Sequence, residues 1–182
     1  THLLNWALRN ILGNHIRQAG SLVEKDRLRF DFSHFEPVKP NILIDIEKIV
    51  NRLIIENILI NTWETAFDEK PKDVIAFFED KYGDRVRIVD IGGFSRELCG
   101  GCHVRRTGEL GFFKIVSETG IAAGTRRIEA IAAHSAHSFA LDAFQTINNF
   151  SVLLNCHQGE VEQRLGAFLA DRHEMEKKFK AL

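Results

Sequence analysis

The sequence has few cysteines, no long hydrophobic run and no initiating methionine. Its 182 residues include three cysteines, two of them three positions apart, and this number and spacing do not predict a disulfide framework. No stretch approaches the roughly 18 uninterrupted apolar residues of a membrane-spanning helix, and no basic segment followed by an apolar one opens the chain as in a signal peptide. These absences argue against a membrane protein and favour a cytoplasmic one.

An excess of charge of either sign is also absent. The chain has 24 Lys and Arg residues against 25 Asp and Glu residues, and its net charge of −1 argues against broad non-specific binding of nucleic acid. With 45% apolar and 27% charged residues, it has the composition of a soluble globular protein that can hold one domain and an appendage. Local basic clusters can still suffice for a specific nucleic-acid contact: Arg85 with Arg87, Arg105 with Arg106, and Arg126 with Arg127.

Hydrophobic periodicity predicts a mixture of helices and strands over the first 131 residues. Leu28, Phe30 and Phe32 alternate with other residues, as in a strand with one buried face. Pro40 suits the first turn of a helix whose buried stripe ends at Ile54. The mixed order of helices and strands predicts an α+β domain. The other expected elements are helix 2–17, strand 58–67, a short helix from Pro71 through Val74, Phe77 and Phe78 to Gly83, and strands 86–89, 112–117 and 126–131.

Proline is absent after position 71, and from residue 132 the pattern becomes helical. Apolar residues are spaced alternately three and four apart along two stretches, which is the a/d spacing of a coiled coil. We therefore expect residues 132–182 to form two antiparallel helices that pack together, joined by a loop at 155–159. The two seams consist of Ala140, Ala143, Ile147, Phe150 and Leu154, and of Val161, Leu165, Phe168, Arg172, Met175, Phe179 and Leu182.

The segment 95–103, Ser-Arg-Glu-Leu-Cys-Gly-Gly-Cys-His, carries the most informative chemistry of the chain. It places the Cys99 thiol four residues before the His103 imidazole, and both are ligand types that suit zinc. The two glycines between them would allow a tight loop that turns both donors toward one point. A pair alone does not make a four-ligand site, and the motif has two other interpretations. Cys99-x2-Cys102-His103 also matches covalent haem attachment, and the two cysteines match a redox dithiol.

Four motifs, in the same order along the chain, resemble the editing domain of alanyl-tRNA synthetases. They are Gln18-Ala19-Gly20-Ser21-Leu22-Val23, Leu28-Arg29-Phe30-Asp31-Phe32-Ser33-His34, the Cys99–His103 loop, and Ala123-Gly124-Thr125-Arg126-Arg127-Ile128-Glu129-Ala130. The resemblance is close over residues 1–131 and loose over the remainder. It implies an α+β editing domain of the alanyl/threonyl-tRNA synthetase type at 1–131. A coiled-coil-like helical hairpin at 132–182 would then lead toward a C-terminal oligomerisation domain.

The resemblance also implies a zinc site made by His2, Cys99 and His103. In the family, a further histidine precedes the one at the position of His2 by four residues, which falls before Thr1. The chain is therefore expected to be a piece cut within this motif, with three of the four ligands. Zinc would then be weakly bound or absent, although the nearby Cys102 thiol could replace the missing ligand.

The same resemblance assigns roles around the metal, and each residue also has a simpler interpretation. Thr1 would sense the extra hydroxyl of serine, or it would only cap the first helix. Gln18 would hold the substrate or the attacking water, with Ser21 beside it, although both could be polar turn residues. Phe32 would form a wall of the substrate pocket, or it would belong to the hydrophobic core.

The implied activity is hydrolysis of mischarged Ser-tRNA(Ala) and Gly-tRNA(Ala), with the acceptor end of the tRNA as the partner. An alanine pocket cannot strongly reject glycine or serine, because one small group changes binding by only ~1–3 kcal/mol, so a second, hydrolytic site is needed. One of Arg126 and Arg127, which face opposite ways on a strand, would reach the terminal adenosine or its phosphates. The alternatives are a non-catalytic tRNA-binding and oligomerisation module and a free-standing editing factor.

Overall fold

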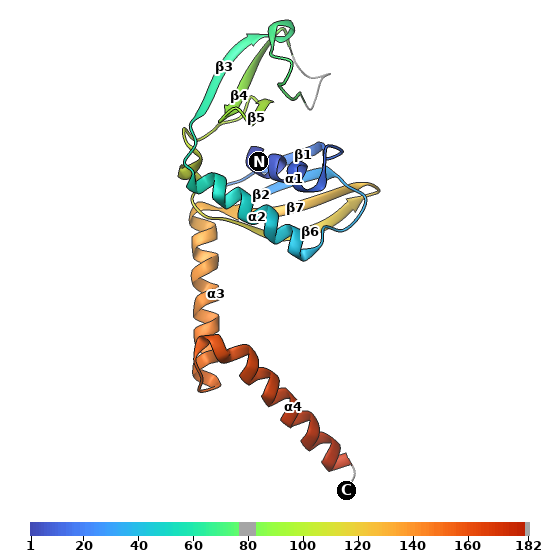
Figure 1. Cartoon of the computed structure of the whole chain (residues 1–182), viewed down its shortest axis with the longest axis vertical. Helices are drawn as coiled ribbons and strands as arrows, with labels where there is room; N and C mark the ends of the chain where they lie inside the picture. The colour runs from blue at the N-terminus through green and yellow to red at the C-terminus, as the bar shows by residue number, and fades with distance from the viewer. Residues whose placement is uncertain (77–82, 181–182) are drawn as a thin grey trace. The chain divides into compact units, whose positions relative to one another are not determined.

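A four-stranded antiparallel sheet organises the first part of the chain (Figure 1). The computed structural model describes residues 1–76 and 83–180, and the chain divides into two compact units, Thr1–His137 and Ser138–Leu182. The strand order in the sheet is β1-β2-β7-β6, so strands from both ends of the first unit meet at its centre. The strands are β1 (Gln18–Val23), β2 (Leu28–Ser33), β6 (Phe113–Ala122) and β7 (Thr125–Ala132).

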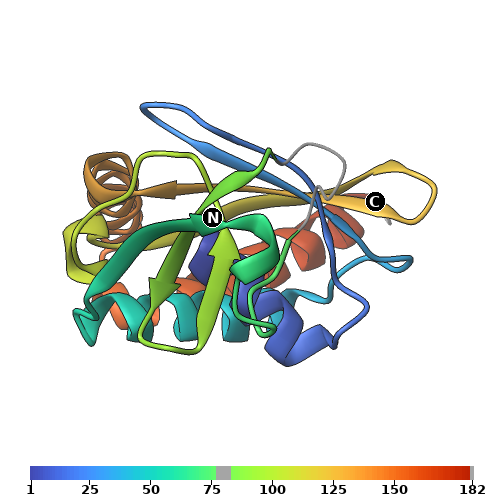
Figure 2. The ribbon, with the colours of Figure 1, turned by 90° about the horizontal axis from the view of Figure 1, so that it is seen from above.

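Two helices, α1 (His2–Leu12) and α2 (Pro40–Ile55), supply the apolar side chains that pack with this sheet (Figure 2). Leu4 and Leu8 of α1, Ile46 of α2 and Phe30 of β2 share one core and are at most 1% exposed. Each such side chain contributes ~1.5–3 kcal/mol through its removal from water. This packing fixes the first turn of α1, and therefore His2, relative to the sheet.

A second antiparallel sheet carries the Cys99 motif. Its strands β3 (Ile60–Ala66), β4 (Arg85–Ile91) and β5 (Ser95–Leu98) lie in the order β3-β4-β5. The turn between β4 and β5 requires glycine at position 92, because Gly92 has a φ of +56° and a Cβ there would lie 2.9 Å from Ile58. The strand β5 that follows this turn ends at Leu98, so Cys99 comes directly after it.

The N-terminal helix is shorter than expected, and a strand follows it. We expected a helix over residues 2–17, but α1 ends at Leu12, with Gly13 in the left-handed region at a φ of +110°. The next element is β1, an edge strand whose residues are mostly exposed and whose pairing is irregular between Gln18 and Gly20. An exposed edge strand has no buried face, so its sequence shows no alternation of apolar and polar residues.

The other expected elements of the first unit are confirmed, with one exception. The strands expected at 28–32, 58–67, 86–89, 112–117 and 126–131 correspond to β2, β3, β4, β6 and β7. The short helix expected from Pro71 is wrong over residues 71–76, where the chain makes a turn and Ile75 forms an isolated bridge with Glu97. Phe77 and Phe78, which we assigned to the same helix, lie outside the described residues.

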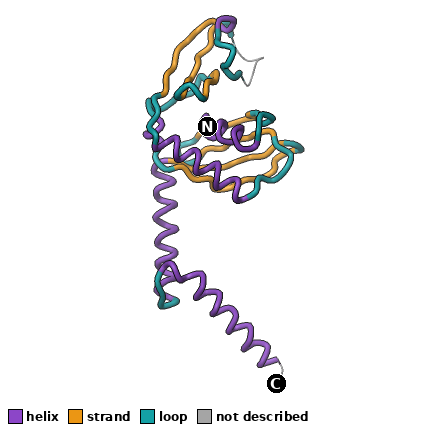
Figure 3. The backbone as a smooth tube through the Cα atoms, viewed as in Figure 1, coloured by secondary structure: helices purple, strands orange, loops and turns teal. Residues whose placement is uncertain are grey.

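Helices make up the second unit. The helix α3 (Ala133–Leu153), which begins in the first unit, and α4 (Val161–Lys180) are separated by the short 3-10 turn η4 (Gln158–Glu160), so the expected break is confirmed (Figure 3). The expected packing of the two seams against each other is wrong, because most of their apolar side chains are exposed. Ile147, Phe150, Leu165 and Phe168 are 40–60% exposed. Over residues 1–76 and 83–180, every helix is too short or too polar to cross a membrane.

Candidate metal centre and active site

A cavity of about 790 Å³ lies between the first turn of α1, strand β1 and the loop that follows β5. Apolar side chains from both sheets and from α2 form much of its wall, and a few polar side chains converge on it. This combination is usual for the binding site of a small molecule or of part of a larger substrate. The polar residues in the wall are Thr1, His2, Gln18, Ser21, Glu97, Cys99, Cys102 and His103.

Three potential metal ligands meet in this cavity. One donor atom from each of His2, Cys99 and His103 lies within 4.8 Å of the other two. The two Nε2 atoms of His2 and His103 are only 3.1 Å apart, although the residues are 101 positions apart in the sequence. The expectation that these side chains converge is therefore confirmed.

The two glycines of the loop do not have the role that we expected. Neither Gly100 nor Gly101 has a positive φ, and a Cβ at Gly100 would meet nothing within 4 Å. At Gly101 a Cβ would make ordinary contacts, at 3.5 Å from Sγ of Cys99 and 4.0 Å from Cε1 of His103. The bend between the two ligands thus uses ordinary backbone conformations, and the site has space for a Cβ at either position.

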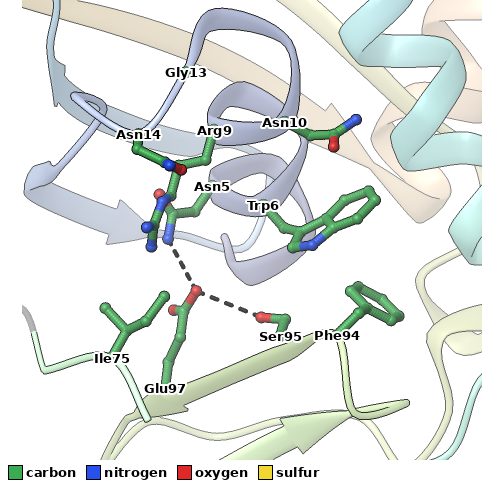
Figure 4. A pocket seen from close by; sticks show the side chains of 10 residues that line it. All are labelled: Asn5, Trp6, Arg9, Asn10, Gly13, Asn14, Ile75, Phe94, Ser95 and Glu97. Carbon is green, nitrogen blue, oxygen red and sulfur yellow. Dashed lines mark hydrogen bonds between the residues drawn. The ribbon is translucent and has the colours of Figure 1, made fainter. Parts of the chain in front are cut away.

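A buried acid, Glu97, orients His2. Its side chain is only 3% exposed, and its Oε2 atom accepts a hydrogen bond of 2.5 Å from Nδ1 of His2. Its Oε1 atom accepts hydrogen bonds from Nδ2 of Asn5 at 2.9 Å and from Oγ of Ser95 at 3.4 Å (Figure 4). A carboxylate on Nδ1 fixes the tautomer of a histidine and directs Nε2 toward a metal.

Cys99 and His2 are electrostatically coupled. Hydrogen bonds from His103 and His2 lower the pKa of the Cys99 thiol to about 5, against the opposing effect of its partial burial. Burial is the largest single influence on His2 and lowers its pKa, but the interactions with Cys99 and Glu97 together outweigh it and raise the pKa to about 9. At neutral pH the group therefore combines a thiolate with an imidazolium.

Arg87 of β4 holds the loop that carries His103. Its Nη1 atom donates to the carbonyl oxygen of Gly101 at 2.6 Å and lies 3.5 Å from Nδ1 of His103. This short bond fixes the backbone of the loop after Cys99, whereas Glu97 lies before Cys99 in the sequence. Arg87 thus acts on the position of a ligand without being a ligand itself.

The structure places the residues expected to contact substrate in two groups. Thr1, Gln18 and Ser21 line the cavity, and Nε2 of Gln18 donates to Oγ of Ser21 at 2.9 Å. Phe32 does not line it: its side chain is fully buried in the core, so the expectation that it forms a wall of the pocket is corrected in favour of the core interpretation.

The two arginines of β7 are held in ion pairs and do not line the cavity. Arg126 donates two hydrogen bonds to Glu118, at 2.5 and 2.7 Å, and Arg127 donates two to Asp31, at 2.6 and 2.8 Å. Planar bidentate pairs of this kind hold both side chains in place. The expectation that one of these arginines is solvated while the other reaches a ligand is thus not met in this structure.

Cys102 lines the same cavity but lies outside the group of three ligands. Its side chain is exposed, and neither it nor Cys99 forms a disulfide. Two residues orient the ligands, Glu97 and Arg87. Sequence reasoning gave no role to Glu97 and considered Arg87 only as part of a basic cluster for nucleic-acid contact. A signal existed for Glu97, because Ser95 and Glu97 alternate along β5 on its inward face, where an acid needs partners.

Comparison with known proteins identifies the domain. Residues 86–129, which include Cys99 and His103, match the model of the second additional domain of threonyl and alanyl tRNA synthetases. The chain therefore contains an additional domain of the aminoacyl-tRNA synthetase class. Within the motif, the grouping of Cys99 and His103 with His2, and not with Cys102, favours the metal-ligand interpretation over a redox dithiol.

Whole-chain similarity narrows this class to one family. The chain is 49% identical over 180 residues to the alanine–tRNA ligase of Opitutus terrae, covering 99% of this chain and 19% of that protein. It is 46% and 45% identical over 183 residues to the alanine–tRNA ligases of Hydrogenovibrio crunogenus and Geobacillus kaustophilus, covering all of this chain and 21% of each. Over the length that it spans, about a fifth of these relatives, the chain belongs to the alanyl-tRNA synthetase family.

Proposed function

We propose that His2, Cys99 and His103 hold a zinc ion at an editing site that hydrolyses Ser-tRNA(Ala) and Gly-tRNA(Ala). The observation that carries this proposal is the convergence of three donor atoms within 4.8 Å in a mostly apolar cavity. A thiolate and two imidazole nitrogens form a donor set that suits zinc, and three protein ligands leave a coordination position for water or substrate. The lowered pKa of Cys99 supports the fit, because only the thiolate is a good ligand.

The reaction is the hydrolysis of an ester. The bond between the carbonyl carbon of the amino acid and a ribose oxygen breaks, and water supplies the new oxygen of the released carboxylate. Zinc, when bound, supplies a Lewis acid or a point of attachment for the substrate. Since Nε2 of Gln18 donates to Ser21, its amide oxygen can accept a hydrogen bond from the attacking water or from the amino group of the substrate.

Recognition of serine requires a group that binds one hydroxyl. Thr1 lies in the wall of the cavity beside His2, and we assign its hydroxyl to this role. A polar site that bonds a substrate hydroxyl rejects the analogue lacking it much more strongly than an apolar pocket rejects an extra group. Such a contact would favour Ser-tRNA(Ala) over Ala-tRNA(Ala), and it contributes nothing to the selection of Gly-tRNA(Ala), whose amino acid also lacks the hydroxyl.

The acceptor end of tRNA(Ala) is the proposed partner. Arg126 and Arg127 are engaged in ion pairs, so Arg105 is a better candidate for a contact with phosphate. It is exposed, it follows the cavity residue Val104, and its guanidinium has no partner among residues 1–76 and 83–180. Because this partner is the tRNA that a cell charges with alanine, the location that we infer is the cytoplasm.

A non-catalytic role in tRNA binding and oligomerisation is the second candidate. The exposed apolar seams of α3 and α4 favour it, because such surfaces are usually covered by another helix. In this case the seams would continue into a C-terminal oligomerisation domain. The similarity to relatives about five times as long favours a part of a ligase over a free-standing editing factor.

Hydrolysis of charged tRNA tests the proposal. We expect the chain to release serine and glycine from tRNA(Ala) and to leave Ala-tRNA(Ala) intact. An N-terminal extension that places a histidine four residues before His2 should raise zinc occupancy and hydrolysis together. In this extended chain, Cys99→Ala should abolish both. Cys156→Ala, which removes another partly buried thiol from the second unit, should change neither.

The opposite outcome is equally clear. If the extended chain folds and binds zinc but hydrolyses none of the three esters, or all three at the same rate, the editing assignment fails. The binding-module interpretation would then replace it.

A further inference from the structure

A second cavity, of about 460 Å³, shares Glu97 with the candidate metal centre but is otherwise lined by different residues. It lies between α1, β5 and the segment that contains Ile75, entirely within the first unit. None of the proposed steps of ester hydrolysis uses it. Its wall consists of Asn5, Trp6, Arg9, Asn10, Gly13, Asn14, Ile75, Phe94, Ser95 and Glu97 (Figure 4).

Asn5 leaves a buried hydrogen-bond acceptor in this wall. Its side chain is fully buried, and its Nδ2 atom donates to Glu97. Because a carboxylate only accepts hydrogen bonds, the amide nitrogen must be the atom that faces Glu97, and the orientation of the amide is fixed. The remaining Oδ1 atom is buried and has no hydrogen-bond partner among residues 1–76 and 83–180. Buried acceptors in native proteins are usually satisfied by protein or by water, so this atom can accept a hydrogen bond from a donor that enters the cavity.

Three further polar side chains in the wall are unengaged. Within residues 1–76 and 83–180, the guanidinium of Arg9 and the amides of Asn10 and Asn14 form no hydrogen bond or ion pair. Arg9 supplies a positive charge with planar donors, and the two amides supply both donors and acceptors. The cavity can therefore bond an anion and the edge of a heterocycle at the same time.

Two aromatic side chains complete the wall. The rings of Trp6 and Phe94 lie edge to face, with centroids 4.9 Å apart and an interplanar angle of 63°. Both residues are partly exposed, so ring surface is available to a further planar group. Figure 4 shows these rings on one side of the cavity and Arg9 and Asn14 on the other.

We propose that this cavity binds an unstacked nucleobase with an exocyclic amino group, cytosine or adenine, together with its phosphate. The amino group would donate to Oδ1 of Asn5, and an amide of Asn10 or Asn14 would donate to the adjacent ring nitrogen. Trp6 and Phe94 would pack against the face of the base, and Arg9 would bond the phosphate. Stacking on aromatic side chains with hydrogen bonds to base edges is how proteins recognise single-stranded RNA.

The source of this base follows from the proposed function, on which this part of the inference rests. If the ester of a charged tRNA lies beside His2, a neighbouring nucleotide of the same single-stranded acceptor end would occupy the second cavity. Glu97 supports this arrangement, because one carboxylate contacts His2 in the first cavity and Asn5 in the second. A free nucleotide presents the same chemistry, and the experiment separates the two sources.

Fluorescence of Trp6 in metal-free protein tests the proposal. Trp63→Phe leaves Trp6 as the sole tryptophan of the chain, and CMP, AMP and UMP are titrated separately. CMP or AMP should quench the fluorescence with at least tenfold higher affinity than UMP, which has a carbonyl where cytosine has its amino group. Arg9→Gln should weaken this binding at least tenfold. The matched control Arg164→Gln removes an exposed guanidinium on α4 that forms no hydrogen bond or ion pair with the described residues, and it should leave the affinity unchanged.

Absence of quenching, equal affinity for UMP, or unchanged binding by Arg9→Gln would overturn the nucleobase site. A short RNA hairpin that ends in single-stranded cytosine-cytosine-adenosine should bind at least tenfold more tightly than either mononucleotide. Equal affinity would overturn the acceptor end as the source. Because these titrations need neither zinc nor an ester, their failure is distinct from a failure of ester hydrolysis.

Discussion

The apparent affinity for zinc should rise with pH because a proton on His2 competes with the metal. Interactions with Cys99 and Glu97 raise the pKa of His2 to about 9, whereas the pKa of Cys99 is lowered to about 5. Between these values the thiol is already ionised and the imidazole is still protonated. Zinc binding must therefore displace about one proton, and the proton comes from His2.

The pKa of about 9 sets the size of the effect. Displacement of one proton changes the apparent binding constant tenfold for each pH unit below the pKa of His2. At pH 7, about two units below it, zinc binding should be ~100-fold weaker than at the plateau, or ~2.7 kcal/mol at 1.36 kcal/mol per unit. Above pH 9 the affinity should no longer depend on this group.

Competition with a chromophoric chelator, at several pH values between 7 and 9.5, measures this dependence once the chelator's own protonation is subtracted. Glu97→Gln provides an internal check, because loss of the negative charge lowers the pKa of His2 and should move the plateau to lower pH. A zinc affinity that is flat between pH 7 and 9 would refute the assignment of the proton to His2.

Other substitutions test which residues affect zinc affinity and which affect the stability of the fold. Glu97→Gln should weaken zinc binding by ~10–100-fold at pH 9.5, where the proton on His2 no longer competes, because it disturbs the carboxylate that orients this ligand. Cys102→Ser should leave zinc affinity unchanged in the same competition, because this exposed thiol lies outside the ligand group. Thr107→Val should lower the free energy of urea unfolding by ~1–3 kcal/mol, because the buried hydroxyl donates to one backbone carbonyl and accepts from one backbone N–H. Thr119→Val, at an exposed position, is its matched control, and equal losses in both would contradict the account.

The sequence predicted those elements whose burial leaves a periodic pattern. Strand β2 was predictable because Phe30 and Phe32 are fully buried and alternate with less apolar neighbours. Strand β1 was not, because an exposed edge strand obtains its order from backbone pairing with β2 rather than from a buried face. The seam of α4 indicated a helix correctly, but the spacing of Leu165 and Phe168 identifies an apolar face without specifying what covers it.

Some residues of the candidate site were also predictable from the sequence, and others were not. Cys99 and His103 were recognisable from local spacing, and the position of His2 beside them was accessible only through a resemblance to a family. Glu97 was missed because the sequence alone does not distinguish a buried, hydrogen-bonded glutamate from an exposed one, and its partner His2 is 95 positions away. Distant pairs of this kind are fixed by the packing of α1 against both sheets, which no short window of sequence contains.

The strand order β1-β2-β7-β6 has a consequence for how the chain acquires its structure. Because β7 lies between β2 and β6, the ribbon of β1 and β2 has no further sheet partner until synthesis has reached Ala132. Pairings between such distant segments require closure of a long loop before they gain any contact, and they slow folding. During synthesis on a ribosome, the first third of this domain would remain without its partner strands. During that time it would be the part most exposed to proteases and most dependent on chaperones.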